Sequence, residues 1–272
     1  IPMSVYGFVT EQSGISLSLA GSGPGFLLVA FFIAFAMIHA RWFGGHTAET
    51  AASMEERFWS SLRALPSVVL AAFVIGVIYT GIATPTEAAA IGFAVALVIT
   101  GLVLRTLTWQ GFKEAAYDSM VTTVAILLIV AGAKVFGKAI TLYRIPQEIS
   151  MFIGQNIDTP LAFILVVSVV LLIMGLVFEA LSMVLIMTPV LLPAAMALGF
   201  DPIWFGVYMV VMVECALITP PVGLNLYVIQ SVAKSSLSDV SRGVLPFLAL
   251  MLLSVVILYV WTDLALYIPF KL

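Results

Sequence analysis

The longest apolar stretch of the chain, Thr159–Phe200, constrains its fold more than any other feature. It is 42 residues long, and its single charged side chain, Glu179, lies at its centre. As one helix it would be about 63 Å long, about twice the hydrocarbon thickness of a bilayer. We therefore expect the chain to turn back near Gly175–Ser182 and to form a hairpin of two helices.

Two kinds of hairpin fit this pattern. The turn can lie at the far membrane surface, which makes two full spans and places Glu179 in water. Alternatively, both arms are tilted and the turn is buried, which makes a re-entrant hairpin with Glu179 and Ser182 at its tip. Pro189 and Pro193 favour an irregular second arm, but the pattern leaves both arrangements open.

Composition indicates the class of protein. Of the 272 residues, 62% are hydrophobic and 9% are charged, whereas soluble domains carry about 25% charged residues. The mean hydropathy is +1.19, and the apolar runs are too long for barrel strands, so we expect an all-α integral membrane protein. The net charge of −3 says little about partners, because the charges lie in a few loops; we expect no nucleic-acid partner. The single cysteine, Cys215, excludes an intrachain disulfide.

A second apolar run, Met209–Tyr227, is interrupted by consecutive prolines. Proline has no backbone N–H, so Pro220 and Pro221 are expected to free the carbonyls one turn earlier, at Ala216 and Leu217. Bare carbonyls are tolerated at membrane depth only inside protein or beside a polar cavity. Discontinuous helices of this kind hold substrate and coupling ion in secondary transporters.

The residues around these prolines suit a cation. Free carbonyls, the Thr219 hydroxyl and the Asn225 amide are hard oxygen ligands of the sort that an alkali cation accepts. The structural alternative is a proline kink whose carbonyls are satisfied by neighbouring helices. The combination Thr-Pro-Pro-x-Gly-x-Asn favours the ion site over a simple kink.

A shorter motif, Thr84-Pro85-Thr86-Glu87, fits a capping box, with Thr84 as N-cap and Glu87 at the third helical position. It predicts that a helix starts at Pro85, inside or close to the membrane. The functional alternative is that Glu87 is an ionisable group in a transport path. We interpret the motif as structural.

The remaining segments are assigned by their polarity. Spans are expected at Phe26–Ile38, Pro66–Thr80, Ala88–Leu104, Val121–Val135 and Val244–Ile268, a loop at Glu11–Gly25, and a loop followed by an interfacial helix at His39–Arg63. An amphipathic interfacial helix is expected at Arg105–Asp118. Basic residues in these two surface segments favour the cytoplasmic side. Three further basic residues, Lys134, Lys138 and Arg144, conflict with that topology, so the orientation stays open.

At three places the chain resembles the large membrane subunit of TRAP transporters. These are GIATPTEAAAIG at residues 81–92, LIMTPVLLPAAMALGFDPIWFGV from Leu185, and TPPVGLN at residues 219–225. The likeness covers essentially the whole chain. It implies an elevator-type secondary transporter of the bacterial inner membrane, with two inverted repeats that each contribute a re-entrant hairpin and a discontinuous helix. The implied partners are a small membrane subunit, a periplasmic substrate-binding protein and membrane lipid. The implied function is sodium-driven uptake of organic acids such as sialic acid or C4-dicarboxylates.

The resemblance also divides the chain. It implies the end of the first repeat and a loop at 1–25, a transmembrane helix and interfacial arm at 26–65, paired helices and an interfacial helix at 66–118, a transport core at 119–242, and a terminal transmembrane helix at 243–272. Within the core, residues 160–198 map to the second hairpin and residues 202–233 to the broken helix. The first hairpin has no counterpart in this sequence, so we expect half of the site to be absent or supplied by another chain.

On this mapping the hairpin tip and the break share one site. Na⁺ is expected to bind the carbonyls of Gly175, Ala216 and Val222 and the hydroxyl of Thr219. The residues expected to meet the substrate are Glu179, Ser182, Pro220, Pro221, Gly223 and Asn225. Sodium would brace the tip against the break, so that the substrate finds an ordered site only when the ion is bound. The carboxylates of Glu179 and Glu214 suit an organic anion only if they face the ion or a positive group, or lie outside the pocket.

Other functions fit the residues less well. An intramembrane hydrolase needs a nucleophile and a base, but both histidines, His39 and His46, lie in an expected loop, so we predict no enzyme activity. The alternative to the transporter is an ion channel, or an ion-coupled carrier without a binding protein. A channel would usually show a repeated pore loop, and the sequence shows none.

Overall fold

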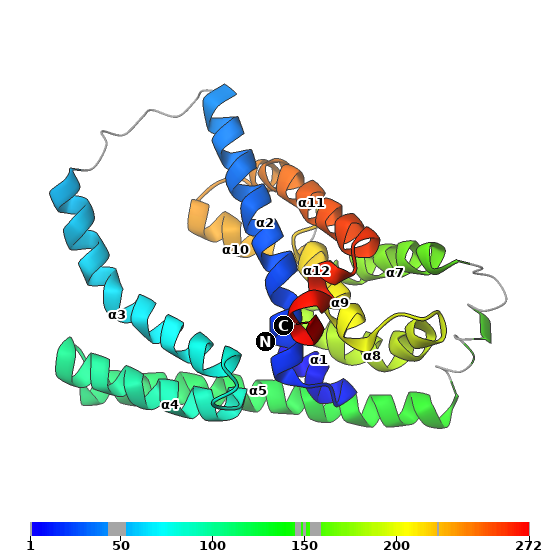
Figure 1. Ribbon diagram of the computed structural model, residues 1–272, viewed down its shortest axis with the longest axis horizontal. Helices are drawn as coiled ribbons and strands as arrows, with labels where there is room; N and C mark the ends of the chain where they lie inside the picture. The colour runs from blue at the N-terminus through cyan, green and yellow to red at the C-terminus, as the bar shows by residue number, and fades with distance from the viewer. Residues whose placement is uncertain are drawn as a thin grey trace. The chain divides into compact units, whose positions relative to one another are not determined.

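The computed structural model describes residues 2–42, 53–144, 148, 151–152, 159–221 and 223–271. Within these ranges every regular element is a helix (Figure 1). The bounds are α1 Pro2–Thr10, α2 Gly14–Trp42, α3 Met54–Tyr79, α4 Pro85–Val98, the π-helical η1 Ile99–Val103, α5 Trp109–Leu142, α7 Pro160–Met174, α8 Ala180–Ala197, α9 Pro202–Leu217, α10 Leu224–Ala233, α11 Leu237–Val260 and α12 Asp263–Lys271. Six helical stretches of this described part are long and apolar enough to cross a membrane, which confirms the all-α membrane class. The chain forms two compact units, residues 1–36 with 127–272, and residues 37–126.

Helix α9 is the centre of the first unit. Apart from Glu214 its sequence is apolar on every side, which is the pattern of a helix buried nearly all round, and 12 of its 16 residues are buried. It packs against α1, α7, α8, α11 and α12, and Figure 1 shows it enclosed among these neighbours. The end of α9 is therefore held in a fixed place by the rest of the unit.

The polar tips of two aromatic side chains fasten α9 to its neighbours. The Trp204 indole donates to the carbonyl of Leu258 in α11 at 3.1 Å. The Tyr208 hydroxyl donates to the carbonyl of Ile164 in α7 at 3.0 Å, and lies 2.8 Å from the Ser168 hydroxyl. Unpaired polar groups are costly in an apolar interior, so these bonds let large amphipathic rings fill the core.

The N-terminal segment, expected as the end of the first repeat, forms a docked helix. Helix α1 packs against α8 and α9, and the fully buried Tyr6 donates its hydroxyl to the carbonyl of Pro202 at 2.7 Å. The Tyr6 ring lies so close to Gly206 that a β-carbon there would be 2.7 Å from a ring carbon. Only glycine, which has no β-carbon, leaves room at position 206 for the Tyr6 ring.

The expected loop at Glu11–Gly25 is wrong, because α2 already begins at Gly14. The hydroxyls of Ser18 and Ser22 donate to carbonyls one turn earlier, at 2.7 and 3.2 Å, so these polar side chains are satisfied within a helix. Gly23 lies directly against the carbonyl of Leu264. Gly23 thus serves close packing inside a helix and does not mark a loop. His39 belongs to the same helix, whereas His46 lies outside the described residues.

In the second unit, α3 is one helix where two elements were expected. It runs for 26 residues from Met54 to Tyr79 and contains Pro66, which was expected to start a span. A capping box between Ser53 and Glu56 starts the helix instead. The proline is accommodated inside the helix, so the interfacial segment and the span are continuous.

Helix α5 likewise replaces an expected interfacial helix and a separate span. It runs unbroken for 34 residues, about 51 Å, which exceeds the hydrocarbon thickness of about 30 Å. At the expected junction, the Thr122 and Thr123 hydroxyls donate to the carbonyls of Asp118 and Ser119 at 2.9 and 2.7 Å. These polar residues are thus part of the continuous helix α5. Because α5 is longer than the hydrocarbon is thick, one of its ends must extend beyond the hydrocarbon.

The predicted capping box at the start of α4 is confirmed. The Glu87 N–H donates to the Thr84 hydroxyl at 3.3 Å, and the Thr84 N–H and hydroxyl each donate to the Glu87 carboxylate at 2.8 Å. The Glu87 side chain is exposed. The carboxylate therefore satisfies the helix start, as the structural interpretation expects.

Candidate functional site

Two helices form the predicted hairpin. Helix α7 has 15 residues and α8 has 18, and Gly175–Glu179 join them. Helix α7 is about 22 Å long, shorter than the hydrocarbon core of about 30 Å. Thr159 caps α7 by accepting from the N–H of Ala162 at 3.2 Å, and Pro160 occupies the first helical position, as helix starts favour.

The tip of this hairpin is in contact with the end of α9. Gly175 is buried, and a β-carbon built on it would overlap the β-carbon of Ala216 and lie 2.8 and 2.9 Å from the Ala216 carbonyl carbon and α-carbon. Carbon atoms in ordinary contact are 3.5–4.0 Å apart, so only glycine fits. Two of the residues predicted to bind sodium, separated by 41 positions, are thus brought together.

At the break after α9, Ile218–Pro221 and Gly223 are not helical, and the peptide bond between Pro220 and Pro221 is cis. The hydroxyl of Thr219 donates to the carbonyl of Cys215 at 2.7 Å. Because a hydroxyl has one proton and two lone pairs, its oxygen can still accept or bind a cation. The half-buried Thr219 therefore presents a neutral oxygen at the break.

One expectation about the break needs correction. Pro220 was expected to leave the carbonyl of Ala216 free, but this carbonyl accepts the N–H of Thr219 at 3.2 Å. The last turn of α9 tightens to hydrogen bonds between residues three apart, so the N–H of Thr219 replaces the donor that Pro220 lacks. A carbonyl has two lone pairs, so the oxygen of Ala216 can still bind an ion.

Gly223 closes the other side of the break. It is buried, and a β-carbon there would lie 2.6 Å from the carbonyl oxygen of Leu217. Its N–H donates to the carbonyl of Thr219 at 3.1 Å. Backbone, rather than a side chain, thus covers the Leu217 carbonyl. Val222, predicted as a sodium ligand, lies outside the described residues.

The predicted substrate residues fall into two groups. At the tip, the Glu179 carboxylate accepts from both the N–H and the hydroxyl of Ser182 at 3.1 Å, and caps α8. At the break, Pro220 and Asn225 are half-buried and Pro221 is exposed. Glu179 and Ser182 therefore engage each other, which gives the carboxylate a structural role that the sequence did not reveal.

Four helix ends gather at the tip and the break. Helices α7 and α9 end at Gly175 and Ile218, and helix C-termini carry a partial negative charge that favours cations. Helices α8 and α10 begin in the same two segments, and helix N-termini favour anions. Glu179 already neutralises the start of α8, whereas α10 has no side-chain cap at Gly223. Of these two helix starts, only that of α10 is therefore left without a side-chain cap.

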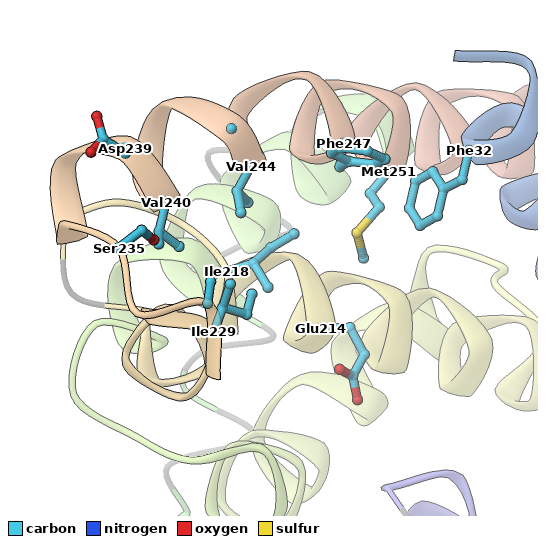
Figure 2. Close-up of a pocket in the computed structure, with 12 residues that line it drawn as sticks. Phe32, Glu214, Ile218, Ile229, Ser235, Asp239, Val240, Val244, Phe247 and Met251 are labelled. Atoms are coloured by element: carbon cyan, nitrogen blue, oxygen red, sulfur yellow. The ribbon is translucent and has the colours of Figure 1, made fainter. Parts of the chain in front are cut away.

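A separate cavity of about 620 Å³ lies between α2, α9, α10 and α11 (Figure 2). Its wall is mostly apolar and includes Phe32, Phe247 and Met251. Glu214 and Asp239 supply its acidic groups and lie well apart in Figure 2. Two carboxylates on an apolar wall do not suit an organic anion, so this cavity is a poor substrate site. Glu214 is among the residues that line this cavity.

Cys215 is a site residue that the sequence reasoning missed. It contributes through its carbonyl, which holds the Thr219 hydroxyl, and its thiol is fully buried. Threonine hydroxyls in helices commonly bond to the carbonyl four residues earlier. The spacing of Thr219 and Cys215 therefore contained this signal.

Comparison with known proteins confirms the resemblance to the large membrane subunit of TRAP transporters. The family described as "Tripartite ATP-independent periplasmic transporter, DctM component" matches residues 1–264. The chain is 33% identical to the sialic acid TRAP transporter large permease protein SiaM of Vibrio cholerae, over 99% of this chain and 63% of that protein. It is 37% identical to the C4-dicarboxylate TRAP transporter large permease protein DctM of Pseudomonas aeruginosa, over 94% of this chain and 60% of that protein.

A third relative is the 2,3-diketo-L-gulonate TRAP transporter large permease protein YiaN of Escherichia coli, which is 31% identical over 100% of this chain and 63% of its own length. The chain thus spans about three fifths of the length of the curated relatives that it matches. These relatives are transport permeases rather than enzymes. The chain belongs to the DctM-component family of tripartite ATP-independent periplasmic transporters.

Proposed function

We propose that this chain forms part of the membrane permease of a sodium-driven secondary transporter for organic acids. In this proposal the permease works with a small membrane subunit and a periplasmic substrate-binding protein, as the tripartite family name suggests. The chain is a multi-pass protein of the bacterial inner membrane. Its own contribution is the ion and substrate site at one hairpin and one broken helix.

The contact between Gly175 and Ala216 carries this proposal. It joins the C-terminal ends of α7 and α9, where helix dipoles favour a cation. Backbone carbonyls of both residues and the Thr219 hydroxyl are neutral oxygens within this region. We place Na⁺ there, where it holds the tip against the break in a re-entrant arrangement.

The substrate class follows from the chemistry of the adjacent helix start. Helix α10 begins without a side-chain cap, and its N–H groups favour an anion. Asn225 lies in its first turn, and Gly223 and the two prolines shape the approach. Two of the relatives are named for sialic acid and C4-dicarboxylates, both of which are carboxylates. We therefore propose a small organic carboxylate as the substrate.

Uptake into proteoliposomes that contain the complete transporter tests the proposal. Uptake of a radiolabelled carboxylate should require an inward sodium gradient and the binding protein together. Replacing sodium by potassium, or omitting the binding protein, should reduce uptake to the level of empty liposomes. Flux that continues without any ion gradient would identify a channel, and sodium-driven uptake without the binding protein would identify a simpler carrier.

The capping role of Glu87 makes a separate prediction. Glutamine keeps an oxygen that can accept from the Thr84 N–H, so Glu87→Gln should leave uptake within about twofold of wild type. Glu87→Ala removes the carboxylate half of the capping box and should lower the melting temperature. Uptake and thermal melting of the purified transporter measure the two effects. Lost uptake with unchanged melting in Glu87→Gln would show that the carboxylate acts in transport.

A further inference from the structure

The corner between η1 and α5 in the second unit is built as a fixed turn. Arg105 adopts a left-handed conformation with φ of +53°, and the chain then folds back. The N–H groups of Thr106 and Leu107 both donate to the carbonyl of Thr100, at 3.0 and 3.2 Å. Thr108 caps α5 by accepting from the N–H of Gly111 at 3.1 Å. These bonds hold the side chains of the corner in place.

The corner encloses an apolar cavity of about 400 Å³. Its wall is formed by Leu97, Leu107, Thr108, Trp109 and Phe112. The rings of Trp109 and Phe112 stack with their centroids 5.7 Å apart and their planes at 12°. Trp109 is nevertheless 70% exposed, so its outer face is available to an apolar ligand.

A basic side chain lies beside this cavity, and a second one lies at the start of the turn. The ammonium of Lys113 lies 5.4 Å from the centre of the Trp109 ring, within cation–π distance. Residues 109, 112 and 113 share one helix face, because positions three and four apart are neighbours. The exposed Arg105 begins the turn that leads to this face.

The nearby acidic groups point elsewhere. The acidic residues Glu114 and Asp118 share a helix face with Gln110, because the three positions are spaced four residues apart. This face lies about 140° around the helix from the Trp109 face. The Gln110 amide donates to the Glu114 carboxylate at 2.7 Å, which holds that acid on its own face. The helix face that carries Trp109, Phe112 and Lys113 is therefore aromatic and positive, without an acidic group.

The position of the corner along the membrane identifies its occupant. Two candidate spans, Thr86–Val103 and Trp109–Gly132, meet there, so the corner lies where hydrocarbon gives way to headgroups. Tryptophan and basic residues are typical of this depth. We propose that the corner is a binding site for an anionic phospholipid, with an acyl chain in the cavity and the phosphate beside Arg105 and Lys113. The bound lipid anchors the turn between α4 and α5 at the membrane surface.

Native mass spectrometry of the complete purified transporter tests this site. The protein is exposed to equal amounts of phosphatidylglycerol and phosphatidylcholine of identical acyl chains, and the ratio of bound lipids is measured. Each basic residue near an anionic membrane surface strengthens the attraction to it by a similar factor. The double variant Arg105→Gln/Lys113→Gln should therefore lower the phosphatidylglycerol preference at this site by roughly 30-fold. Trp109→Ala should weaken binding of both lipids, because it removes part of the apolar wall.

The matched control is Arg57→Gln/Arg63→Gln, which removes the same charge from the exposed surface of α3 and should leave the lipid ratio unchanged. Equal loss of phosphatidylglycerol in both double variants would show a general charge effect and overturn the site. Inorganic phosphate that displaces the lipid would assign the basic groups to free phosphate instead. The readout is lipid binding, so it does not depend on the proposed transport activity.

Discussion

Gly175→Ala should lower sodium-driven uptake by about 100-fold, because misplacing a functional group by about 1 Å can cost this much. The new β-carbon would overlap the β-carbon of Ala216 and lie 2.8 Å from its carbonyl carbon. The hairpin tip must then move away from α9 by more than 1 Å to restore a contact of 3.5–4.0 Å. Oxygens on the two sides would no longer reach one ion. Initial uptake rates against sodium concentration in proteoliposomes measure this loss.

Two companion variants separate this effect from a general loss of folding. Gly243→Ala adds the same methyl group to α11, where nothing lies within 4 Å of the new β-carbon, and should leave uptake unchanged. Combining Gly175→Ala with Ala216→Gly removes the β-carbon of Ala216, which is the closest atom, and should restore part of the sodium affinity. The recovery should be incomplete, because the backbone at position 216 still crowds the tip. Wild-type sodium dependence in Gly175→Ala would show that transport does not need this contact.

The elements that could be predicted from the sequence are those fixed by local chemistry. The capping box at Thr84 and Glu87 depends on two side chains three residues apart, and the turn near Gly175 follows from the length of the apolar run. The interruption at Pro220 follows from the missing backbone N–H. In each case the residues that decide the structure are neighbours in the sequence.

The elements that could not be predicted depend on contacts between distant residues. Tyr6 docks against Gly206 and Pro202, and nothing near Tyr6 in the sequence encodes that partner. The glycines before residue 25 favour a loop by propensity, yet Gly23 serves close packing against Leu264. Tertiary packing thus outweighs local propensity at these positions.

The same distinction applies to the candidate site. The sequence predicts oxygen ligands at Thr219 and carbonyls one turn before the prolines, and it assigns the carboxylate of Glu179 to the substrate. In the structure the Glu179 carboxylate caps α8 through the N–H and the hydroxyl of Ser182, and its assignment to the substrate stays a prediction. Glutamate is not among the residues that are preferred at the N-cap, and the order Glu-x-x-Ser is the reverse of a capping box, so the sequence carries no clear signal of this role.

Thr219→Val should weaken the apparent sodium affinity without unfolding the protein. Valine keeps the shape of threonine and removes the oxygen, which leaves the proposed cation one ligand short. Losing a buried polar interaction costs about 1–3 kcal/mol, which corresponds to a roughly 5- to 150-fold change in affinity. The carbonyl of Cys215 loses the hydroxyl donor but keeps the N–H of Ile218 at 3.3 Å. The backbone hydrogen bond at the C-terminal end of α9 is therefore kept.

A matched substitution elsewhere distinguishes ion binding from a simple loss of a hydrogen bond. The hydroxyl of Thr100 donates to the carbonyl of Ala96 at 2.7 Å, the same geometry that Thr219 has with Cys215. Thr100→Val should leave the sodium dependence unchanged, and Thr219→Ser should be milder than Thr219→Val because it keeps the oxygen. An unchanged sodium dependence in Thr219→Val would remove this hydroxyl from the ion site, and the carbonyls at the tip and the break would have to hold the ion alone.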